Sequence, residues 1–360
     1  MPRPLSVLAL TRFPPLGASS RLRFFSYQHR LAALGIDVVY QPFFDTPYTR
    51  AAFTGERKPL LSALVGLKRR VSVVSATAAD LLWIEYEALP WLPYVAERWL
   101  LSGRPYVVEY DDALFHRYDL NSRALVKAVL GTKIDRLMAG AASVICGSHY
   151  LRDRAIQAGA TSVHLLPTVV DVARYGRHRA SPDSRTIGWM GSASTERYLD
   201  TVAAALKEAL SLTAGKLLLV GSGRVPDSLK SLGEQVEARR WRENTEAAWL
   251  SEMALGIMPL EDGPWERGKC GYKLVQYMAA GLPAIASPVG ENRHILGPPR
   301  STGILASTHD EWVTALVALL KNPQVRQRMG NQARALAEQQ YSLDVTAPLL
   351  ANVLRSAARE

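Results

Sequence analysis

Short runs of apolar residues alternate along the chain with longer segments in which apolar residues recur every three or four positions. The short runs, bounded by Gly, Pro and polar residues, predict buried strands, and the longer segments predict amphipathic helices. This alternation is typical of folds built on parallel sheets. Strands are predicted at Leu5–Leu10, Asp37–Gln41, Leu81–Glu85, Tyr106–Glu109 and Ser143–Cys146, and then at Thr186–Met190, Lys216–Val220, Leu255–Pro259 and Ala284–Ser287.

A segment poor in apolar residues, Asp171–Arg185, separates the two groups of strands and is typical of a linker. A length of 360 residues suggests about two domains. The sequence therefore predicts an α/β fold of two doubly wound, Rossmann-like domains, over 1–175 and 176–340, and a C-terminal helix over 341–360 that packs back on the first domain. Helices are predicted at Arg21–Leu34, Thr195–Leu210, Thr245–Glu252, Tyr272–Ala280, Asp310–Lys321 and Pro323–Tyr341.

Composition narrows the class of protein. The chain is 48% hydrophobic and 21% charged, with no apolar stretch of about 18 residues, so we expect no membrane span. Only two cysteines, Cys146 and Cys270, are present, and a reducing cytosol is the simplest compartment. The net charge of +10 favours anionic partners. No nucleic-acid recognition motif and no convincing metal motif accompanies that charge, so neither nucleic acid nor a metal is expected.

Ligands of doubly wound sheets bind beyond the carboxyl ends of the strands, so we expect a cleft between the domains to hold the site. In the second half, a Gly- and charge-rich loop at 263–271 leads into the helix predicted from Tyr272. Free N–H groups from Gly271 onward, with Lys269 and Lys273, predict a diphosphate cradle. Lys273 and Gln276 lie on one face of that helix. The alternative is a polar loop that caps an ordinary helix.

Two further turns follow predicted strands of the second half. In GWMGSAST, residues 188–195, Ser194 or Thr195 predicts a helix N-cap, and nearby N–H groups with Arg197 are suited to a phosphate. The turn at Gly221 in LLLVGSGR, residues 217–224, is weak evidence by itself. A simple capping motif with Arg197 in solvent is the alternative for the first turn.

The first half offers two polar clusters. Asp111 and Asp112 end a predicted buried strand, and one of these carboxylates is suited to accept a proton from a hydroxyl group. The alternative is an aspartate that caps the next segment. The second cluster follows the first strand, where a glycine permits close approach to a ligand and polar residues begin a helix; these acceptor-side candidates are Gly17, Ser19, Ser20 and Arg21.

The motif KLVQYMAAGLPAIASPVGEN at 273–292 resembles the donor-binding region of bacterial GT-B glycosyltransferases of family 4, the glycosyl transferases group 1. The resemblance includes IGWMGSASTERYL at 187–199, LLLVGSG at 217–223 and MALGIMPLED at 253–262, and it extends more weakly to GASSRLR and EYDDALF in the first half. Gly268 and Gln276 stand where this family has two glutamates, which leaves the sugar contact and the donor identity undecided, although Glu266 lies nearby.

The resemblance implies a cytoplasmic, metal-independent, hexosyltransferase-like enzyme of cell-envelope polysaccharide biosynthesis with no cofactor. A UDP-, GDP- or TDP-sugar would bind the second domain and a glycan or lipid-linked acceptor the first, with retention of configuration. A sugar-nucleotide 2-epimerase and a non-catalytic nucleotide-sugar-binding protein remain the alternatives. The donor-binding residues that it implies are Gly191, Ser192, Ser194, Thr195, Arg197, Gly221, Trp241, Glu266, Arg267, Lys269, Gly271, Tyr272, Lys273 and Gln276.

A basic and apolar segment at 55–75 adds a hypothesis about location. Leu60, Leu61, Leu64, Val65 and Leu67 form one stripe at helical spacing, with basic residues beside it. Such a helix can lie on an anionic membrane, here on the inner face of the cell membrane. The alternative is an internal helix that buries its stripe and leaves its cations in water. The basic residues are Arg57, Lys58, Lys68, Arg69 and Arg70.

Overall fold

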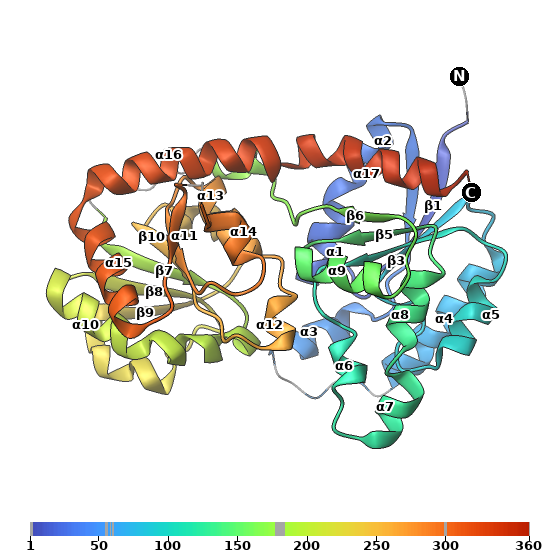
Figure 1. The fold of residues 1–360 in the computed structure, drawn as a ribbon, viewed down its shortest axis with the longest axis horizontal. Helices are drawn as coiled ribbons and strands as arrows, with labels where there is room; N and C mark the ends of the chain where they lie inside the picture. Colours follow the sequence, from blue (N-terminus) through green and yellow to red (C-terminus); the bar gives the residue numbers. More distant parts are fainter. Residues whose placement is uncertain are drawn as a thin grey trace. The chain divides into compact units, whose positions relative to one another are not determined.

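The computed structural model describes residues 3–54, 57, 59, 61–176, 184–298 and 301–359. The chain forms two compact units (Figure 1). The first comprises Met1–Val169, Arg267–Cys270 and Leu343–Glu360, and the second Val170–Glu266 and Gly271–Ser342. The second unit therefore begins at Val170, and a four-residue piece of the Gly- and charge-rich loop lies with the first unit.

The first unit contains a parallel sheet in the order β2-β1-β3-β4-β5-β6, with helices on both faces (Figure 1). Its strands are β1 (Leu5–Leu10), β2 (Ile36–Tyr40), β3 (Leu81–Glu85), β4 (Tyr106–Tyr110), β5 (Ser143–Cys146) and β6 (Val163–Leu165). Its helices are α1 (Ala18–Arg23), η1 (Phe25–Tyr27), α2 (Gln28–Ala33), α3 (Thr46–Thr54), α4 (Leu61–Ala76), α5 (Tyr94–Leu101), α6 (His116–Asp119), α7 (Ala124–Leu130), α8 (Lys133–Ala139), α9 (His149–Gln157) and α17 (Leu343–Ala357).

The second unit repeats this architecture in the order β12-β11-β10-β7-β8-β9. Its strands are β7 (Thr186–Met190), β8 (Lys216–Gly221), β9 (Val236–Arg240), β10 (Leu255–Met258), β11 (Ala284–Ala286) and β12 (Gly303–Leu305). Its helices are η2 (Val172–Tyr175), η3 (Ala193–Val202), α10 (Ala203–Thr213), η4 (Asp227–Gln235), α11 (Glu246–Leu250), α13 (Tyr272–Ala279), α14 (Asn292–Leu296), α15 (His309–Lys321) and α16 (Pro323–Gln340), and α12 (Pro264–Arg267) begins in this unit. The α/β fold with two parallel sheets is thus confirmed.

Each sheet separates two apolar cores. In β1, Leu8 and Leu10 pack into one core of the first unit, and Val7 and Ala9 pack into the other. Alternate side chains of a strand point to opposite faces, so a strand covered on both faces is apolar throughout. This double burial is why the short apolar runs were readable as strands. α17 packs beside α2 and against β3 and β4 within the first unit.

Three strands that are short or carry charged residues were not predicted from the sequence. β6 and β12 have three residues each, and β9, with the sequence VEARR, is an edge strand that carries three charged residues. The helix predicted over Arg21–Leu34 is also wrong as one element. Phe24, with φ −124° and ψ −67°, interrupts it between α1 and η1.

Helix α4 corrects the expectation for the segment at 55–75. Arg70 is fully buried, so it is not one of the cations that can face a lipid surface. The alternative, an internal helix that buries its stripe and leaves all its cations in water, is wrong. Leu61, Leu64 and Val65 are 71%, 64% and 59% exposed, whereas Ser62, Gly66, Arg70 and Val74 form the buried face. Gly55, Glu56, Lys58 and Leu60 lie outside the described residues.

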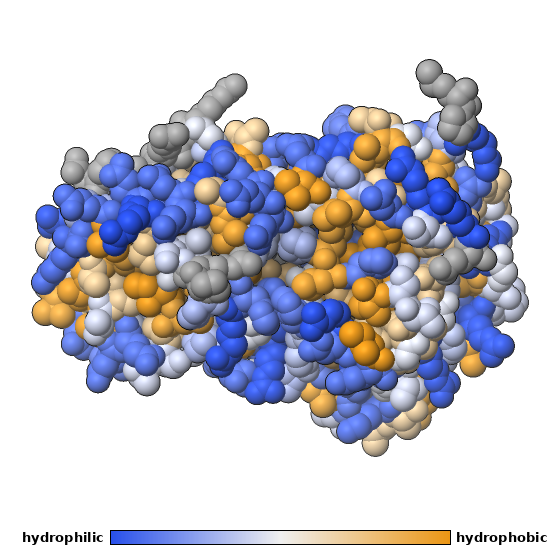
Figure 2. Space-filling view, turned by 45° about the horizontal axis from the view of Figure 1, so that its top comes forward, coloured by the Kyte–Doolittle hydropathy of each residue, from blue (hydrophilic) through white to orange (hydrophobic). Residues whose placement is uncertain are grey.

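The surface of the protein is mostly polar, as expected when the apolar residues are buried in the cores. On the face in Figure 2, polar and charged residues predominate, with small apolar groups between them, as on most folded proteins. Within the described ranges, no helix is long and apolar enough to cross a membrane.

Candidate functional site

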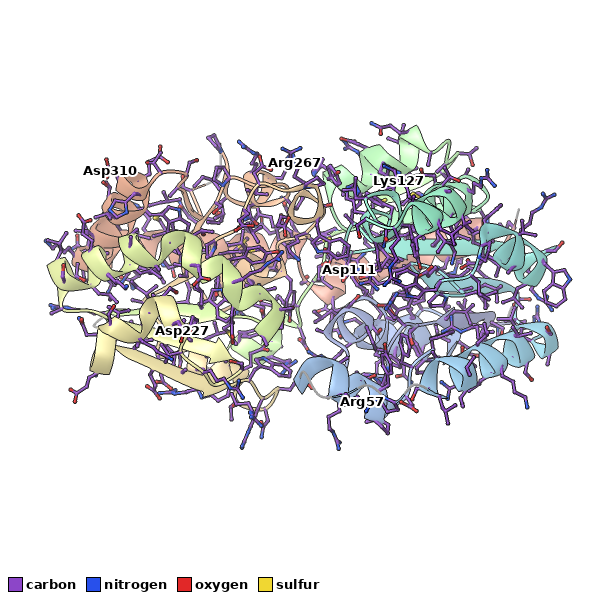
Figure 3. All side chains as sticks on the ribbon, turned by 90° about the horizontal axis from the view of Figure 1, so that it is seen from below. Arg57, Asp111, Lys127, Asp227, Arg267 and Asp310 are labelled. Carbon is purple, nitrogen blue, oxygen red and sulfur yellow. The ribbon has the colours of Figure 1, made fainter. Side chains whose placement is uncertain are left out.

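In the first unit, the carboxyl ends of three neighbouring strands bring polar groups together. Ser19 follows β1 and Glu85 ends β3. Asp111, which is labelled in Figure 3, follows β4. The Ser19 hydroxyl lies 2.8 Å from Glu85 Oε1, 2.9 Å from Asp111 Oδ1 and 3.1 Å from the Tyr86 hydroxyl. The Tyr86 hydroxyl donates to the same Asp111 oxygen. The structure thus unites one predicted catalytic residue with one predicted acceptor-side residue.

Glu85 and Tyr86 were missed by the sequence analysis. Burial, with the charge of Asp111 as a second cause, raises the pKa of Glu85 from 4.5 to about 7. Tyr86 has a φ of +63°, a left-handed conformation that is rare for a residue with a side chain and is enriched at functional sites. A signal was present in the sequence, since Glu85 is a charged residue at the end of an otherwise apolar strand.

The other acceptor-side candidates have structural partners. Ser20 is buried, where it donates to Glu85 Oε2 at 2.5 Å and accepts from the Phe13 amide. A side chain at Gly17 would collide with Phe13, so the glycine permits a close approach within the loop itself. The Arg21 guanidinium donates to the carbonyl of Pro15.

Asp112 and part of the predicted cradle lie together in the first unit. Lys269 Nζ is 3.7 Å from Asp112 Oδ1, and the Cys270 thiol donates to the carbonyl of Asp111. The carbonyl of Gly268 accepts a hydrogen bond from Ser148, and a side chain at Gly268 would strike Ala113. The loop piece Arg267–Cys270 therefore packs directly behind the two aspartates, which no local sequence pattern indicated.

In the second unit, the loop after β7 begins helix η3. Gly191 donates its amide to Val220, and a side chain there would strike Trp189. The expected N-cap is wrong by two or three residues: Ser192 is the N-cap, and Thr195 Oγ1 accepts from the Ser192 amide. The Ser194 hydroxyl instead lies 2.9 Å from the Ser192 hydroxyl, in the first turn of a 3-10 helix.

Two side chains of the predicted donor site, Arg197 and Glu266, are joined by a hydrogen bond, and Tyr198 joins them. Arg197 donates to Glu266 Oε1 at 3.0 Å, and the Tyr198 hydroxyl donates to the same oxygen. The Arg197 side chain is 63% exposed, whereas that of Glu266 is nearly buried. Glu266 therefore orients an exposed guanidinium at the carboxyl edge of the second sheet.

Helix α13 and the glycine before it present further donor candidates. Gly271 precedes it with a φ of +69°, and a side chain there would strike Ile295. Lys273 Nζ lies 5.7 Å from the centre of the Trp189 ring. Gln276 is buried beside the hydroxyl of Tyr175, and burial is the largest cause of a raised Tyr175 pKa.

Trp241, which follows β9 next to Gly221, is held by a residue that the sequence analysis missed. Its indole N–H donates to Glu246 Oε2 at 2.8 Å, and the Tyr175 hydroxyl donates to the other carboxylate oxygen. The Trp241 amide donates to the carbonyl of Gly221. Glu246 thereby fixes an aromatic ring at the same edge of the sheet as the loop after β7. Nothing in the local sequence distinguishes Glu246 from a solvated helix residue.

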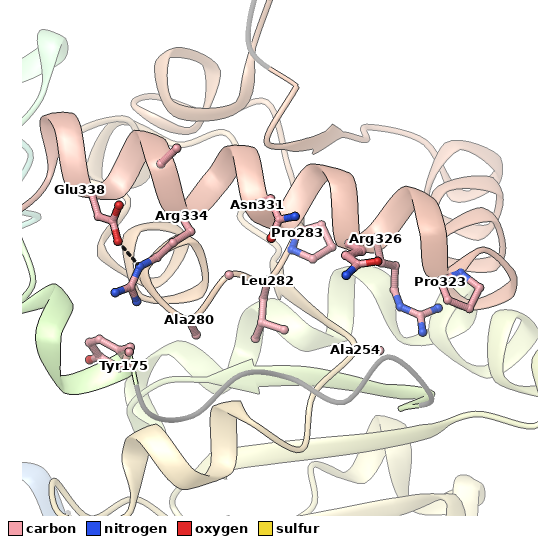
Figure 4. A pocket seen from close by; sticks show the side chains of 14 residues that line it. Tyr175, Ala254, Ala280, Leu282, Pro283, Pro323, Arg326, Asn331, Arg334 and Glu338 are labelled. Atoms are coloured by element: carbon pink, nitrogen blue, oxygen red, sulfur yellow. Dashed lines mark hydrogen bonds and ion pairs between the residues drawn. The ribbon is translucent and has the colours of Figure 1, made fainter.

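A separate cavity of about 350 Å³ lies beneath α16 in the second unit (Figure 4). Arg326 and Arg334 line it, and Arg334 is tied to Glu338 at 2.7 Å. It reaches Ala254 and Pro283, which immediately precede β10 and β11. The cavity therefore lies at the amino ends of these strands, away from the edge where ligands of doubly wound sheets bind.

The family match falls in the second half of the chain, whereas similarity in structure covers nearly all of it. Residues 184–322 match the family model of glycosyl transferases group 1. Over 184 residues, the chain is 27% identical to the GDP-mannose-dependent monoacylated alpha-(1-6)-phosphatidylinositol monomannoside mannosyltransferase of Corynebacterium glutamicum. That alignment covers 49% of this chain and 47% of the relative, so the chain matches about half the length of this curated relative.

Solved structures resemble the whole chain. Sucrose-phosphate synthase from Thermosynechococcus elongatus has a TM-score of 0.73 at 16% identity, with 98% of each chain covered. HepE from Anabaena, in complex with UDP-glucose, has a TM-score of 0.68 at 17% identity, covering 98% of this chain and 100% of its own. A glycosyltransferase from Rickettsia africae has a TM-score of 0.70 at 12% identity, with 99% of each chain covered. Residues 184–322 of the second unit are therefore similar to the glycosyl transferases of group 1, and the whole chain has the fold of these solved structures.

Proposed function

We propose that the chain transfers a hexose from a nucleotide sugar to a hydroxyl group of a glycan or lipid-linked acceptor, with retention of configuration. The observation that carries this proposal is the hydrogen bonding of the Asp111 carboxylate. Ser19 and Tyr86 hold its Oδ1, whereas Oδ2 accepts no hydrogen bond from the described residues. A partly exposed carboxylate with one oxygen anchored and the other available is suited to take a proton from an acceptor hydroxyl.

The second unit would hold the donor. Arg197 and Lys273 bring positive charge to the carboxyl edge of the sheet, and the first amides of α13 add the positive end of its dipole. We assign the departing diphosphate to these groups, which stabilise its charge without a metal. The indole of Trp241, fixed by Glu246, is placed to border the nucleobase. A UDP-, GDP- or TDP-sugar would meet the same set of groups.

A donor panel tests this function. UDP-, GDP- and TDP-sugars are screened for thermal stabilisation of the protein and for slow hydrolysis, and glycan and lipid-linked products are then identified by mass spectrometry. One sugar nucleotide should stabilise the chain and be hydrolysed slowly, and its sugar should appear on the acceptor. Asp111→Asn is the matched control, since it should keep donor binding and lose transfer. If no sugar nucleotide of the panel stabilises the protein, the proposal is contradicted.

For the acceptor, we propose an amphiphilic molecule met at the inner face of the cell membrane. Helices α4 and α5 lie side by side (Figure 1) and expose apolar side chains on the first unit, Leu61, Leu64, Val65, Val95 and Trp99. Exposed cations accompany them on the same two helices, Lys68, Arg69 and Arg98. Apolar groups flanked by cations fit an anionic lipid surface, where each basic residue contributes about 1 kcal/mol.

Liposome co-sedimentation tests this membrane contact. Binding should rise with the fraction of anionic lipid and fall with salt. The double variant Leu64→Gln, Trp99→Gln should bind at least several-fold more weakly. The control Leu212→Gln makes the same change at an exposed leucine of the second unit and should bind like the wild type. Equal binding by the double variant and the control would refute the assignment of this surface.

A further inference from the structure

The hydrogen bonds around Glu85 identify which of its oxygens can carry a proton. Oε2 accepts from two donors, the amide of Arg12 at 2.6 Å and the hydroxyl of Ser20 at 2.5 Å. Among the described residues, Oε1 meets only the hydroxyl of Ser19, at 2.8 Å. A carbonyl oxygen commonly accepts two hydrogen bonds, so Oε2 has the environment of a carbonyl oxygen and Oε1 that of a carboxylic O–H.

Ser19 stands between two carboxyl groups but has a single proton. Its hydroxyl lies within hydrogen-bond distance of Glu85 Oε1 and of Asp111 Oδ1. If both groups were ionised, Ser19 would donate to one of them and turn a lone pair toward the other. A proton on Glu85 removes this conflict, because Glu85 then donates to Ser19 and Ser19 donates to Asp111.

We propose that Glu85 is a positioning residue that carries a proton and, through Ser19, fixes Asp111 as the single ionised carboxylate of the pair. Tyr86 then donates to Asp111 Oδ1 as well, so both hydroxyls hold the same oxygen. Oδ2 is left for the acceptor hydroxyl. Since the role of Asp111 in transfer belongs to the proposed function, the consequence for activity rests on that function.

The charged groups around Glu85 are consistent with a protonated side chain. Arg70 on α4 directs its bonds to the carbonyls of Thr11, Gln41 and Ala88. The guanidinium of Arg12, after β1, lies 3.5 Å from Glu87, after β3, and Arg23 on α1 pairs with Glu109 on β4 at 2.5 Å. No cation among the described residues is bonded to Glu85. Asp111 and Tyr86 complete its titratable surroundings, and the raised pKa of Glu85 agrees with this geometry.

Ionisation of Glu85 should therefore disturb the site. With a negative charge at Oε1, Ser19 turns its proton toward Glu85, and Asp111 loses one of the two donors to Oδ1. The orientation of its free oxygen is then no longer fixed. Turnover should fall as the pH rises through the range in which Glu85 loses its proton, whereas donor binding, which involves other residues, should not.

The decisive variant is Glu85→Gln, because an amide reproduces the protonated acid: its oxygen accepts from Arg12 and Ser20 while its NH₂ donates to Ser19. The wild-type kcat should fall roughly tenfold or more between pH 6.5 and pH 8.5. In Glu85→Gln this alkaline loss should be reduced to less than threefold. An unchanged alkaline loss would overturn the proposal, and so would a well-folded variant without activity at any pH, since the ionised form would then be required.

A second measurement needs no activity and separates this inference from the proposed function. A carboxyl group whose pKa is higher in the folded than in the unfolded protein destabilises the fold as the pH rises toward the folded value. The melting temperature of Glu85→Gln minus that of the wild type should thus grow from pH 5 to pH 8 and then level off. A constant difference would refute a proton on Glu85. If the difference in melting temperature grows as expected but the protein transfers no sugar, only the proposed function is refuted.

Discussion

Replacement of Arg70 by methionine should destabilise the first unit more than any other loss of a cation on α4. The buried guanidinium donates to the carbonyl of Thr11 at 2.7 Å and to that of Gln41 at 3.1 Å. These carbonyls follow β1 and β2, and a weaker contact of 3.5 Å reaches Ala88 beyond β3. Burial lowers the pKa of Arg70 to about 9, so the side chain is still charged at neutral pH.

The magnitude follows from the bonds that are lost. A hydrogen bond from a charged group contributes about 1.5–3 kcal/mol. The carbonyl of Thr11 keeps the amide of Phe43 as a donor, whereas the carbonyl of Gln41 loses the one donor that it has among the described residues. Methionine fills much of the vacated space and returns part of the loss through apolar burial. We therefore expect a net loss of about 3 kcal/mol in the free energy of unfolding of the first unit.

Calorimetry measures this loss against a control on the same helix. For a unit of about this size, each kcal/mol lowers the melting temperature by about 2–4 °C, so Arg70→Met should melt roughly 6–12 °C lower. Lys68→Met removes an exposed cation and should shift the transition by about 0.5 kcal/mol or less. The second unit contains no part of α4, and its transition serves as an internal reference. Equal shifts for the two variants would refute the structural role of Arg70.

The other predictions concern the proposed site. Lys273→Ala should weaken donor binding by about 1.5–3 kcal/mol in calorimetric titration, with little change in thermal stability; unchanged affinity would remove Lys273 from the cradle. Asp111→Asn should lower turnover by roughly 10²–10⁴-fold while donor affinity persists, and equal losses in both would indicate a different role. Gln276→Glu would bury a second carboxyl near Glu246 across Tyr175, so it should lower the melting temperature at pH 8 more than at pH 5; identical losses would refute this charge effect. Because the Glu85 pKa rises from 4.5 to about 7 on folding, Glu85→Gln should gain about 3 kcal/mol relative to the wild type between pH 4 and pH 8, measured by urea unfolding.

The sequence by itself determined the class of fold and much of the second unit. Strands buried on both faces, such as Leu81–Glu85 and Ser143–Cys146, were readable because apolar runs bounded by polar turns are a local signal. Helices α15 and α16 were predicted to within a residue at each end, since their apolar spacing and their caps are also local. The resemblance at 273–292 rests on contiguous letters and therefore needed no structure.

Only the tertiary structure decided which polar residues meet. Ser19, Glu85 and Asp111 are far apart in the chain, and they come together because the order β2-β1-β3-β4 sets the carboxyl ends of β1, β3 and β4 side by side. The same order brings to Arg70 three carbonyls from the segments that follow β1, β2 and β3, so a cation that was expected to face lipid is a buried donor. Strand order and burial depend on contacts between distant segments, whereas periodicity reports only on neighbours along the chain. The pattern of residues thus predicted most of the buried strands and the loops between them, and the fold decided what each side chain faces.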